Sequence, residues 1–214
     1  LLVQVLLGLA LALAVNRLPA AQGWLTTLLV LPMMVTPVVV GLIWKFLLDY
    51  NFGLVGFLME VLGMGKVAFL SNSAWAMAAV IFVDCWQWTP FTFVILLAGL
   101  KALPSEPYEA AHIDGANWWQ ILTLITLPFL RPVIIVAVVL RLAGLIKEFD
   151  KIYVLTGGGP GTATETIALL LHRGAFLDFD FGHASTIAML LAAAMAVLCW
   201  WAVRMMHSEK GGHS

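Results

Sequence analysis

The sequence predicts an all-α, polytopic membrane protein, and three observations lead to this prediction. Hydrophobic residues make up 62% of the 214-residue chain and charged residues 11%, and the mean hydropathy is +0.99. A soluble domain of this size needs a larger share of polar residues than this composition provides. The apolar residues also form runs long enough to cross a bilayer, which takes about 20 residues in a helix. A net charge of −1 with no basic run gives no indication of nucleic-acid binding.

Five apolar runs are predicted to be membrane-spanning helices. In chain order they cover residues 1–15, 24–48, 73–100, 132–155 and 184–206. Pro32 and Pro37 interrupt the second run and are expected to kink it, because proline removes a helical hydrogen bond. The first run also has the length of a signal-peptide core, an alternative that remains open although a basic leading region is missing.

Connectors separate these spans, and the chain begins inside an apolar run. The connectors cover residues 49–72, 101–131 and 156–183. The first contains scattered glycines around an apolar segment, which is expected to form a short helix at the membrane interface. Because Leu1 already lies in an apolar run, we expect that an N-terminal portion with one more span is missing. The tail His207–Ser214 is polar and is expected to be disordered.

The connector between the third and fourth predicted spans is the longest polar interruption, and it predicts two short helices. Ser105 is expected to cap the first helix, Pro107 suits its opening turn, and Gly115 is expected to end it. The small side chains of Ala110 and Ala111 leave a bare surface that another protein could approach closely.

The second short helix of this loop has two candidate starting residues. These are Asp114 and Asn117, and the helix is expected to close at Pro128. Trp118 and Trp119 are expected to seat it against lipid headgroups, where tryptophan is enriched.

The order of residues in this loop resembles the EAA loop of membrane subunits of binding-protein-dependent ABC importers. The residues that carry this resemblance are Glu109, Ala110, Ala111, Gly115, Ile125, Leu127 and Pro128, and Asp114 is also predicted to belong to the ATPase-coupling loop. An ordinary amphipathic connector is the alternative, since Glu-Ala-Ala alone is common. The resemblance implies the core of a type I ABC importer permease, in which this loop forms a coupling helix that docks on a separate ATPase.

The resemblance also implies partners and an orientation. The expected partners are a second permease subunit, two ATPase subunits that bind ATP and Mg²⁺, an extracytoplasmic solute-binding protein and membrane lipid. The chain itself is then not an enzyme and carries no cofactor. It is expected in the inner (plasma) membrane, with the coupling loop and the C-terminus in the cytoplasm. Lysines and arginines are only slightly more numerous on that side, so the resemblance sets this orientation.

A glycine cluster follows the fourth predicted span. It comprises Gly157, Gly158, Gly159, Pro160 and Gly161, and Thr162 follows directly. A nucleotide-binding P-loop requires a lysine after its last glycine, so that interpretation fails. A sharp turn is the simple interpretation.

The longer segment Phe149–Pro160 resembles one that recurs in the carbohydrate-uptake branch of these permeases. There it lies near the outer gate and the docked binding protein, so residues 157–160 are predicted gate or binding-protein contacts. The resemblance favours a sugar or related polyol as substrate. Amino acids, peptides or phosphate esters carried by the same machine remain alternatives.

Polar residues inside the spans are the candidate substrate path, because a charged group at mid-bilayer costs about 2.5–3.5 kcal/mol on insertion scales. Spacings of three or four residues place the members of each set on one helix face. The first set is Asp84, Gln87, Trp88 and Phe91, and the second includes Arg141 and Glu148. Acid, amide and indole groups together suit a polyol.

Two alternatives to a substrate path remain open. One is a structural ion pair between Asp84 and Arg141, and another is an ion-coupled secondary transporter that uses the same two residues. Glu148, Asp150 and Lys151 are interpreted as lying near the outer surface and being solvated. The spacing of the histidines and cysteines predicts no metal site and no catalytic site.

Overall fold

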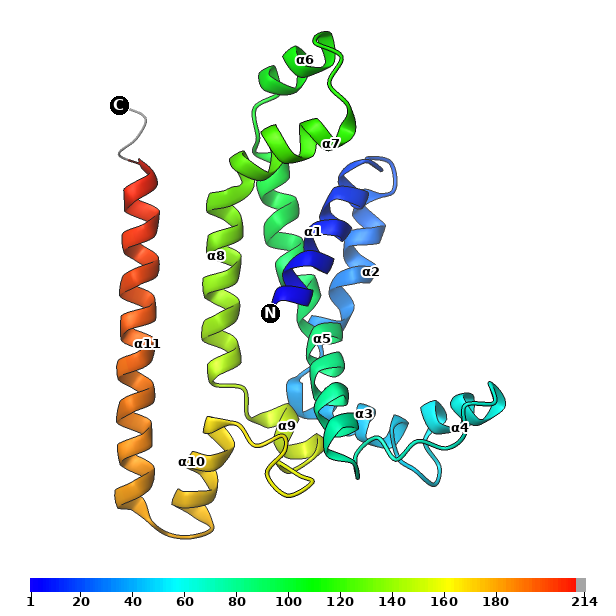
Figure 1. The fold of residues 1–214 in the computed structure, drawn as a ribbon, viewed down its shortest axis with the longest axis vertical. Coiled ribbons are helices and arrows are strands. Elements are labelled where there is room, and N and C mark those ends of the chain that lie inside the picture. Colours follow the sequence, from blue (N-terminus) through cyan, green and yellow to red (C-terminus); the bar gives the residue numbers. More distant parts are fainter. Residues whose placement is uncertain (211–214) are drawn as a thin grey trace. The chain divides into compact units, whose positions relative to one another are not determined.

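The computed structural model describes residues 1–210, which form helices joined by turns and connectors, with no strand in that range (Figure 1). The helices are, in chain order, α1 (Leu2–Asn16), α2 (Gln22–Met34), α3 (Pro37–Leu47), α4 (Leu54–Val61), α5 (Ser73–Lys101), α6 (Glu106–Ile113), α7 (Trp118–Gln120), the π-helix η1 (Ile121–Thr126), α8 (Leu127–Ile146), α9 (Asp150–Leu155), α10 (Ile167–Phe176) and α11 (Phe181–Lys210). The predicted all-α class and the short helix in the first connector, α4, are confirmed.

The chain forms two compact units, which are described separately. Unit 1 comprises Leu1–Leu31, Trp88–Leu142 and the residues from Ala196 onward, and unit 2 comprises Pro32–Gln87 and Ala143–Met195. Helices α2, α5, α8 and α11 each contribute residues to both units.

Three continuous helices in the described part of the chain are long and apolar enough to cross a membrane. They are Ser73–Lys101, Trp118–Ile146 and Phe181–Trp201, and the bent pair α2–α3 would make a fourth span if it is counted as one. Helix α1 is apolar but has only 15 residues.

The predicted second span, residues 24–48, is two helices rather than one kinked helix. Helices α2 and α3 meet at a break of 89°. Thr36, which precedes Pro37, has an extended backbone with ψ 142°. The proline ring disfavours helical geometry in the preceding residue and supplies no N–H, so the helix stops and a new one starts at Pro37.

The predicted fourth span, residues 132–155, begins and ends earlier than expected. The helix starts at Trp118, continues through Pro128 and Pro132, and ends at Ile146, after which α9 is separate. The expectation that the loop helix closes at Pro128 is therefore wrong. The π-helical segment η1 precedes this proline, and such segments accommodate an interrupted ladder of helical hydrogen bonds.

Helix α11 also extends further than the sequence predicted. It includes residues as far as Lys210, so the first half of the polar tail continues the last helix instead of being disordered. Residues 211–214, including the C-terminus that we expect in the cytoplasm, lie outside the described residues.

The core of unit 1 forms where α1, α5 and α8 pack together. Its buried side chains are Ala12, Val15, Phe93, Leu96, Leu97, Leu100 and Leu130. Gly8 allows α1 to approach α5 closely, because an added Cβ would lie 2.5 Å from Thr92 Oγ1. That hydroxyl is fixed by hydrogen bonds to the Gln4 and Thr89 carbonyls, at 3.0 and 2.8 Å. Small residues at such contacts are typical of helix packing in membranes.

The core of unit 2 forms where α3, α5 and α9 meet. Its buried side chains are Val40, Leu48, Phe69, Ala79, Val83 and Leu155. Gly41 of α3 faces the backbone of α9, since an added Cβ would lie 3.0 Å from the Lys151 carbonyl oxygen. This close packing places α9 and its lysine against the rest of the unit.

We expect Gly8→Val to lower the free energy of unfolding by about 1–3 kcal/mol, because overpacking a close contact forces neighbouring atoms to shift. Gly23→Val is the matched control, since Gly23 is exposed in α2 and no atom lies within 4 Å of its added Cβ. The melting temperature of the purified protein should fall for the first variant alone. Equal melting temperatures for the two variants would contradict the close contact.

Candidate functional site

The first candidate region is the hairpin of α6 and α7 in unit 1. Pro107 and Glu106 occupy the first turn of α6 as expected. Ser105 does not cap that helix with its side chain, because its own backbone is already helical, with φ −77° and ψ −29°. Its carbonyl oxygen instead accepts hydrogen bonds from the N–H groups of Tyr108 and Glu109, at 2.9 and 3.0 Å.

The turn after α6 is built as the sequence predicted. Gly115 has φ +73°, and the N–H of Ala116 donates to the Ala111 carbonyl at 2.9 Å, the pattern of a glycine-terminated helix. Of the two candidates for starting the next helix, Asn117 is the cap, and Asp114 ends α6. Asn117 and Gln120 form a reciprocal capping box with distances of 3.0 and 2.7 Å.

The hairpin presents an exposed face and a buried face. Glu109 and Ala110 are exposed, and Ile113 is 87% exposed. Ala111 is only 9% exposed, so the expectation that both alanines form a bare surface is wrong for this residue. The helical period turns neighbouring side chains by about 100°, which directs Ala111 inward when Ala110 faces outward.

The hairpin is also tied to the long helix that follows it. The Tyr108 hydroxyl of α6 donates to Thr126 Oγ1 in η1 at 3.1 Å, and Thr126 donates to the Ile121 carbonyl at 3.2 Å. The remaining predicted loop residues, Ile125, Leu127 and Pro128, lie in η1 and at the start of α8 rather than in α6.

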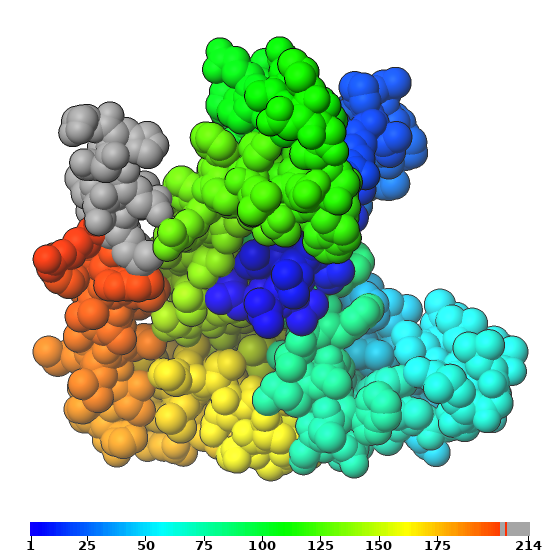
Figure 2. Space-filling view, turned by 45° about the horizontal axis from the view of Figure 1, so that its top comes forward, coloured from blue at the N-terminus to red at the C-terminus, as the bar shows by residue number. Residues whose placement is uncertain are grey.

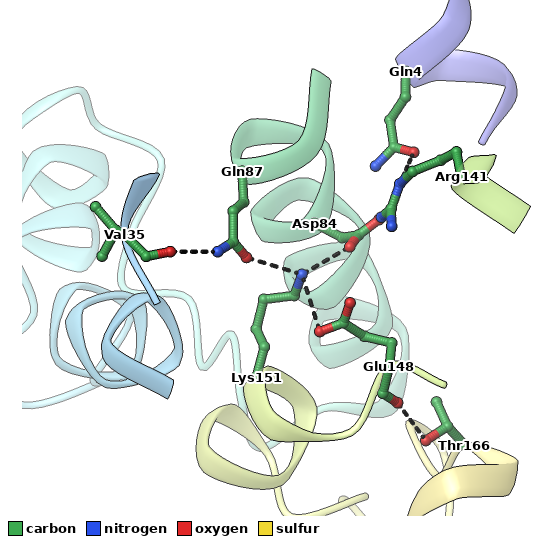
Figure 3. Close-up of polar contacts among 8 residues, drawn as sticks. All are labelled: Gln4, Val35, Asp84, Gln87, Arg141, Glu148, Lys151 and Thr166. Carbon is green, nitrogen blue, oxygen red and sulfur yellow. Dashed lines mark hydrogen bonds and ion pairs between the residues drawn. The ribbon is translucent and has the colours of Figure 1, made fainter. Parts of the chain in front are cut away.

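The second candidate region is a buried ionic cluster in unit 2, which we call the Lys151 cluster (Figure 3). The Lys151 ammonium is 2.7 Å from Asp84 Oδ1, 3.3 Å from Gln87 Oε1 and 3.5 Å from Glu148 Oε1. The lysine side chain is 1% exposed. A charge removed from solvent to this extent needs such partners, because desolvation otherwise costs several kcal/mol.

Hydrogen bonds extend the Lys151 cluster into neighbouring elements of unit 2. Gln87 Nε2 donates at 3.0 Å to the carbonyl of Val35, which lies at the break between α2 and α3. The Thr166 hydroxyl, at the start of α10, donates to the Glu148 carbonyl at 3.2 Å. The cluster thus links the helix break, α5, α9 and the start of α10.

The Lys151 cluster corrects part of the sequence-based prediction. Lys151 is buried and Glu148 is partly buried, so they are not solvated surface groups, whereas Asp150 is exposed as expected. Lys151 was missed because its neighbours in sequence gave no sign of a buried partner. The available signal was its position one turn after Glu148, directly before an apolar run.

The remaining candidate path residues lie in unit 1 around Arg141. The buried Arg141 donates from Nε to Gln4 Oε1 at 2.9 Å, and its guanidinium lies 5.1 Å from the centre of the Trp88 ring. Trp88 and Phe91 are in edge-to-face contact at 6.2 Å. Gln4 was not predicted, although it is the one polar residue among residues 1–15.

The glycine cluster forms a compact turn in unit 2. Gly157, Gly158 and Gly161 have positive φ angles of 61°, 89° and 60°. Thr164 closes the turn, since its hydroxyl donates to the Gly159 carbonyl at 2.8 Å and lies 2.7 Å from that of Thr156. The role of this turn as an outer gate stays a prediction.

A row of aromatic rings beside this turn was not predicted from the sequence. Phe149 and Tyr153 stack at 5.2 Å, and both contact His172, which in turn contacts Phe176 at 5.2 Å. Tyr153 and Phe176 are exposed. Among residues 1–210, no group of three His, Cys, Asp or Glu side chains is arranged to hold a metal ion.

Three or four long apolar segments within residues 1–210, buried ionic side chains and a capped polar hairpin together indicate a polytopic membrane protein. Residues 4–206 match the family described as the binding-protein-dependent transport system inner membrane component, and the chain belongs to this family. The resemblance seen in the sequence is therefore confirmed.

Two of the relatives are permease proteins of a trehalose/maltose and a sulfoquinovosyl glycerol transport system. The chain is 40% identical over 187 residues to the trehalose/maltose transport system permease protein MalF of Thermococcus litoralis, covering 87% of this chain and 63% of the relative. It is 36% identical over 188 residues to the sulfoquinovosyl glycerol transport system permease protein SmoG of Agrobacterium fabrum, covering 87% of this chain and 61% of that protein. The chain thus spans less than two thirds of the length of these relatives.

Two solved structures have a similar fold. One is a bacterial ABC transporter involved in the import of the acidic polysaccharide alginate, with a TM-score of 0.84, 26% identity, and coverage of 94% of this chain and 72% of that chain. The other is a bacterial alginate ABC transporter in complex with an alginate pentasaccharide-bound periplasmic protein, with a TM-score of 0.83, 26% identity, and coverage of 93% and 70%.

We expect Lys151→Met to lower the free energy of unfolding by about 3–5 kcal/mol, because it leaves the buried Asp84 carboxylate without its ammonium partner. The double variant Asp84→Asn with Lys151→Met should recover most of this loss. Lys147→Met, which removes an exposed charge four residues earlier, is the control. Thermal melting of the purified protein measures all three variants, and wild-type stability of Lys151→Met would contradict the cluster.

Proposed function

We propose that this chain is the permease subunit of an ATP-driven importer that moves a sugar or related polyol across the inner membrane. The observation that carries the proposal is the family match over residues 4–206, together with a hairpin that exposes Glu109, Ala110 and Ile113. An isoleucine that is 87% exposed at the end of a polar helix suits a contact with another protein.

A saccharide substrate is supported by the named relatives and by the chemistry of the chain. The relatives carry the names of trehalose, maltose and sulfoquinovosyl glycerol systems, and the similar structures import alginate. A site that binds a sugar needs hydrogen-bonding side chains together with aromatic rings that pack against the apolar face of the sugar. Gln87, Trp88 and Phe91 on α5, and the aromatic row from Phe149 to Phe176, provide both kinds of group.

The proposed assembly contains a second permease subunit, two ATPase subunits and a solute-binding protein. A similar alginate transporter was solved with a periplasmic protein that carries the ligand, which supports the last partner. In the proposed assembly ATP and Mg²⁺ bind the ATPase subunits, and α6 faces them in the cytoplasm.

The hairpin is suited to transmit motion because it is firmly held. The Tyr108–Thr126 hydrogen bond connects α6 to the helix that runs from Trp118 to Ile146, and the capping box at Asn117 fixes the start of that helix. At 1.5 Å per residue this helix is about 43 Å long, enough to carry a displacement across the bilayer.

In this mechanism ATP binding closes the ATPase pair, which moves the docked hairpins and reorients the transmembrane helices. A shift from 1:99 to 99:1 between two orientations requires about 5.5 kcal/mol of differential binding. One small hairpin contact does not supply that energy, so both hairpins and the nucleotide act together. The permease transmits the movement through its hairpin and transmembrane helices, and the ATPase supplies the free energy.

Gly115→Asp tests the coupling role of the hairpin. The variant strains a backbone with φ +73° and adds a charge beside the exposed face of α6, so transport should fall at least about tenfold while the protein stays in the membrane. Gly65→Asp is the control, because Gly65 also has φ +73° with open space around it, but lies in a different connector. Uptake assays in vesicles compare the two, and equal uptake would contradict the role of α6.

A ligand panel tests the substrate class. The assembled transporter with its cognate binding protein should show ATPase stimulation by a saccharide or polyol, and not by amino acids, peptides or phosphate esters. Stimulation by one of the other classes would exclude the sugar assignment. Uptake that persists without ATP and collapses with the proton gradient would instead indicate an ion-coupled secondary transporter.

A further inference from the structure

A cavity of about 460 Å³ lies in unit 1 beneath the α6–α7 hairpin. It forms where the end of α1, the end of α5 and the hairpin come together. Figure 2 shows the green surface of the hairpin bordering the dark blue residues of α1. The lining residues of the cavity that carry polar atoms include Asn16, Arg17, Ser105, Tyr108, His112 and Trp118. A cavity of this volume is within the usual range of small-molecule sites.

The polar lining residues of this cavity favour the binding of an anion. Arg17 contributes a positive charge, and its guanidinium lies over the Trp118 ring, 4.9 Å from the ring centre. Stacking on an indole restrains the guanidinium and leaves the N–H groups at its edge available for a bidentate contact with phosphate. Asn16, Ser105 and His112 add groups that can donate hydrogen bonds. None of the twelve lining residues is acidic.

Apolar side chains also line the cavity, which lies where the apolar helix α1 and the candidate span α5 end. Leu13, Leu100, Leu103 and Ile121 line it, and α1 and α5 both terminate here. The ends of apolar spans lie at the level of lipid headgroups. The neighbouring Trp118 and Trp119 are 45% and 65% exposed, as expected of side chains at that interface.

We propose that this cavity binds the phosphate group of an anionic phospholipid, with Arg17 as its main ligand. The apolar lining residues contact the glycerol and the first part of an acyl chain, which free phosphate does not have. Basic pockets between helices on the cytoplasmic side of a membrane are suited to anionic headgroups. Its main ligand, Arg17, lies outside both candidate regions described above, whereas Tyr108 and His112 of the hairpin also line the cavity.

A bound headgroup would also contact the coupling hairpin, through Tyr108 and His112 of α6. Lipid occupancy would thus stabilise the position of α6 and strengthen coupling to the ATPase. This effect, like the placement of the cavity on the cytoplasmic side, rests on the proposed transport function.

The test uses the assembled transporter reconstituted in nanodiscs of phosphatidylcholine, with or without phosphatidylglycerol. After extraction and washing, mass spectrometry counts the phosphatidylglycerol that stays bound per complex. The wild-type complex should retain it, and Arg17→Gln should weaken retention about tenfold or more, because a charge-assisted contact to phosphate is lost. Lys101→Gln is the control. It removes a positive charge from the end of α5 that borders the cavity, but Lys101 is not one of the lining residues.

Two further comparisons make the result decisive. Arg17→Lys keeps the positive charge but loses the planar guanidinium that makes a bidentate contact with phosphate. The variant complex should therefore retain an intermediate amount of lipid. Inorganic phosphate added to the complex in phosphatidylcholine nanodiscs distinguishes a free anion from a headgroup. Retention of phosphate by the washed complex, counted by the same mass spectrometry, would overturn the lipid assignment. Equal retention by Arg17→Gln and Lys101→Gln would overturn the site. ATPase stimulation by phosphatidylglycerol is then measured separately, so that a failure of coupling is not confused with a failure of binding.

Discussion

The buried ammonium of Lys151 is the constraint on which the arrangement of unit 2 depends. A charge with a 1% exposed side chain needs the Asp84 carboxylate at 2.7 Å, and this requirement fixes α9 against α5. Gln87 serves the same cluster twice, because its oxygen accepts from the lysine and its amide satisfies the Val35 carbonyl at the α2–α3 break. A single polar cluster therefore accounts for both the position of α9 and the tolerance of a broken helix in an apolar region.

Unit 1 combines tight packing with a free surface. Its helices approach closely at Gly8, where the fixed hydroxyl of Thr92 leaves no room for a side chain. Its hairpin, in contrast, leaves Ala110 and Ile113 exposed while Ala111 and Tyr108 anchor the other face. This division is suited to the coupling role proposed above, because a docking surface transmits force only when the element that carries it moves as a rigid body.

Local sequence signals predicted the hairpin well, and their failures have physical reasons. Gly115 and Asn117 were predictable because a positive φ and a helix cap are satisfied within a few residues. Ser105 failed as a cap since its own backbone entered the helix, and Pro128 failed as a stop since η1 accommodates it. The span boundaries shifted for a similar reason: hydrophobicity alone does not reveal where Pro37 ends one helix and begins another.

The sequence by itself determined the all-α membrane class, the family and the hairpin positions, because composition and short-range backbone preferences carry that information. Only the tertiary structure decided which polar groups pair. Gln4 meets Arg141 across 137 residues, Asp84 meets Lys151 across 67, and Gln87 reaches Val35 across 52. Such pairs depend on which helices pack together and at what depth. The packing of the helices thus determines which groups pair with a buried charge, and no local sequence pattern predicts that pairing.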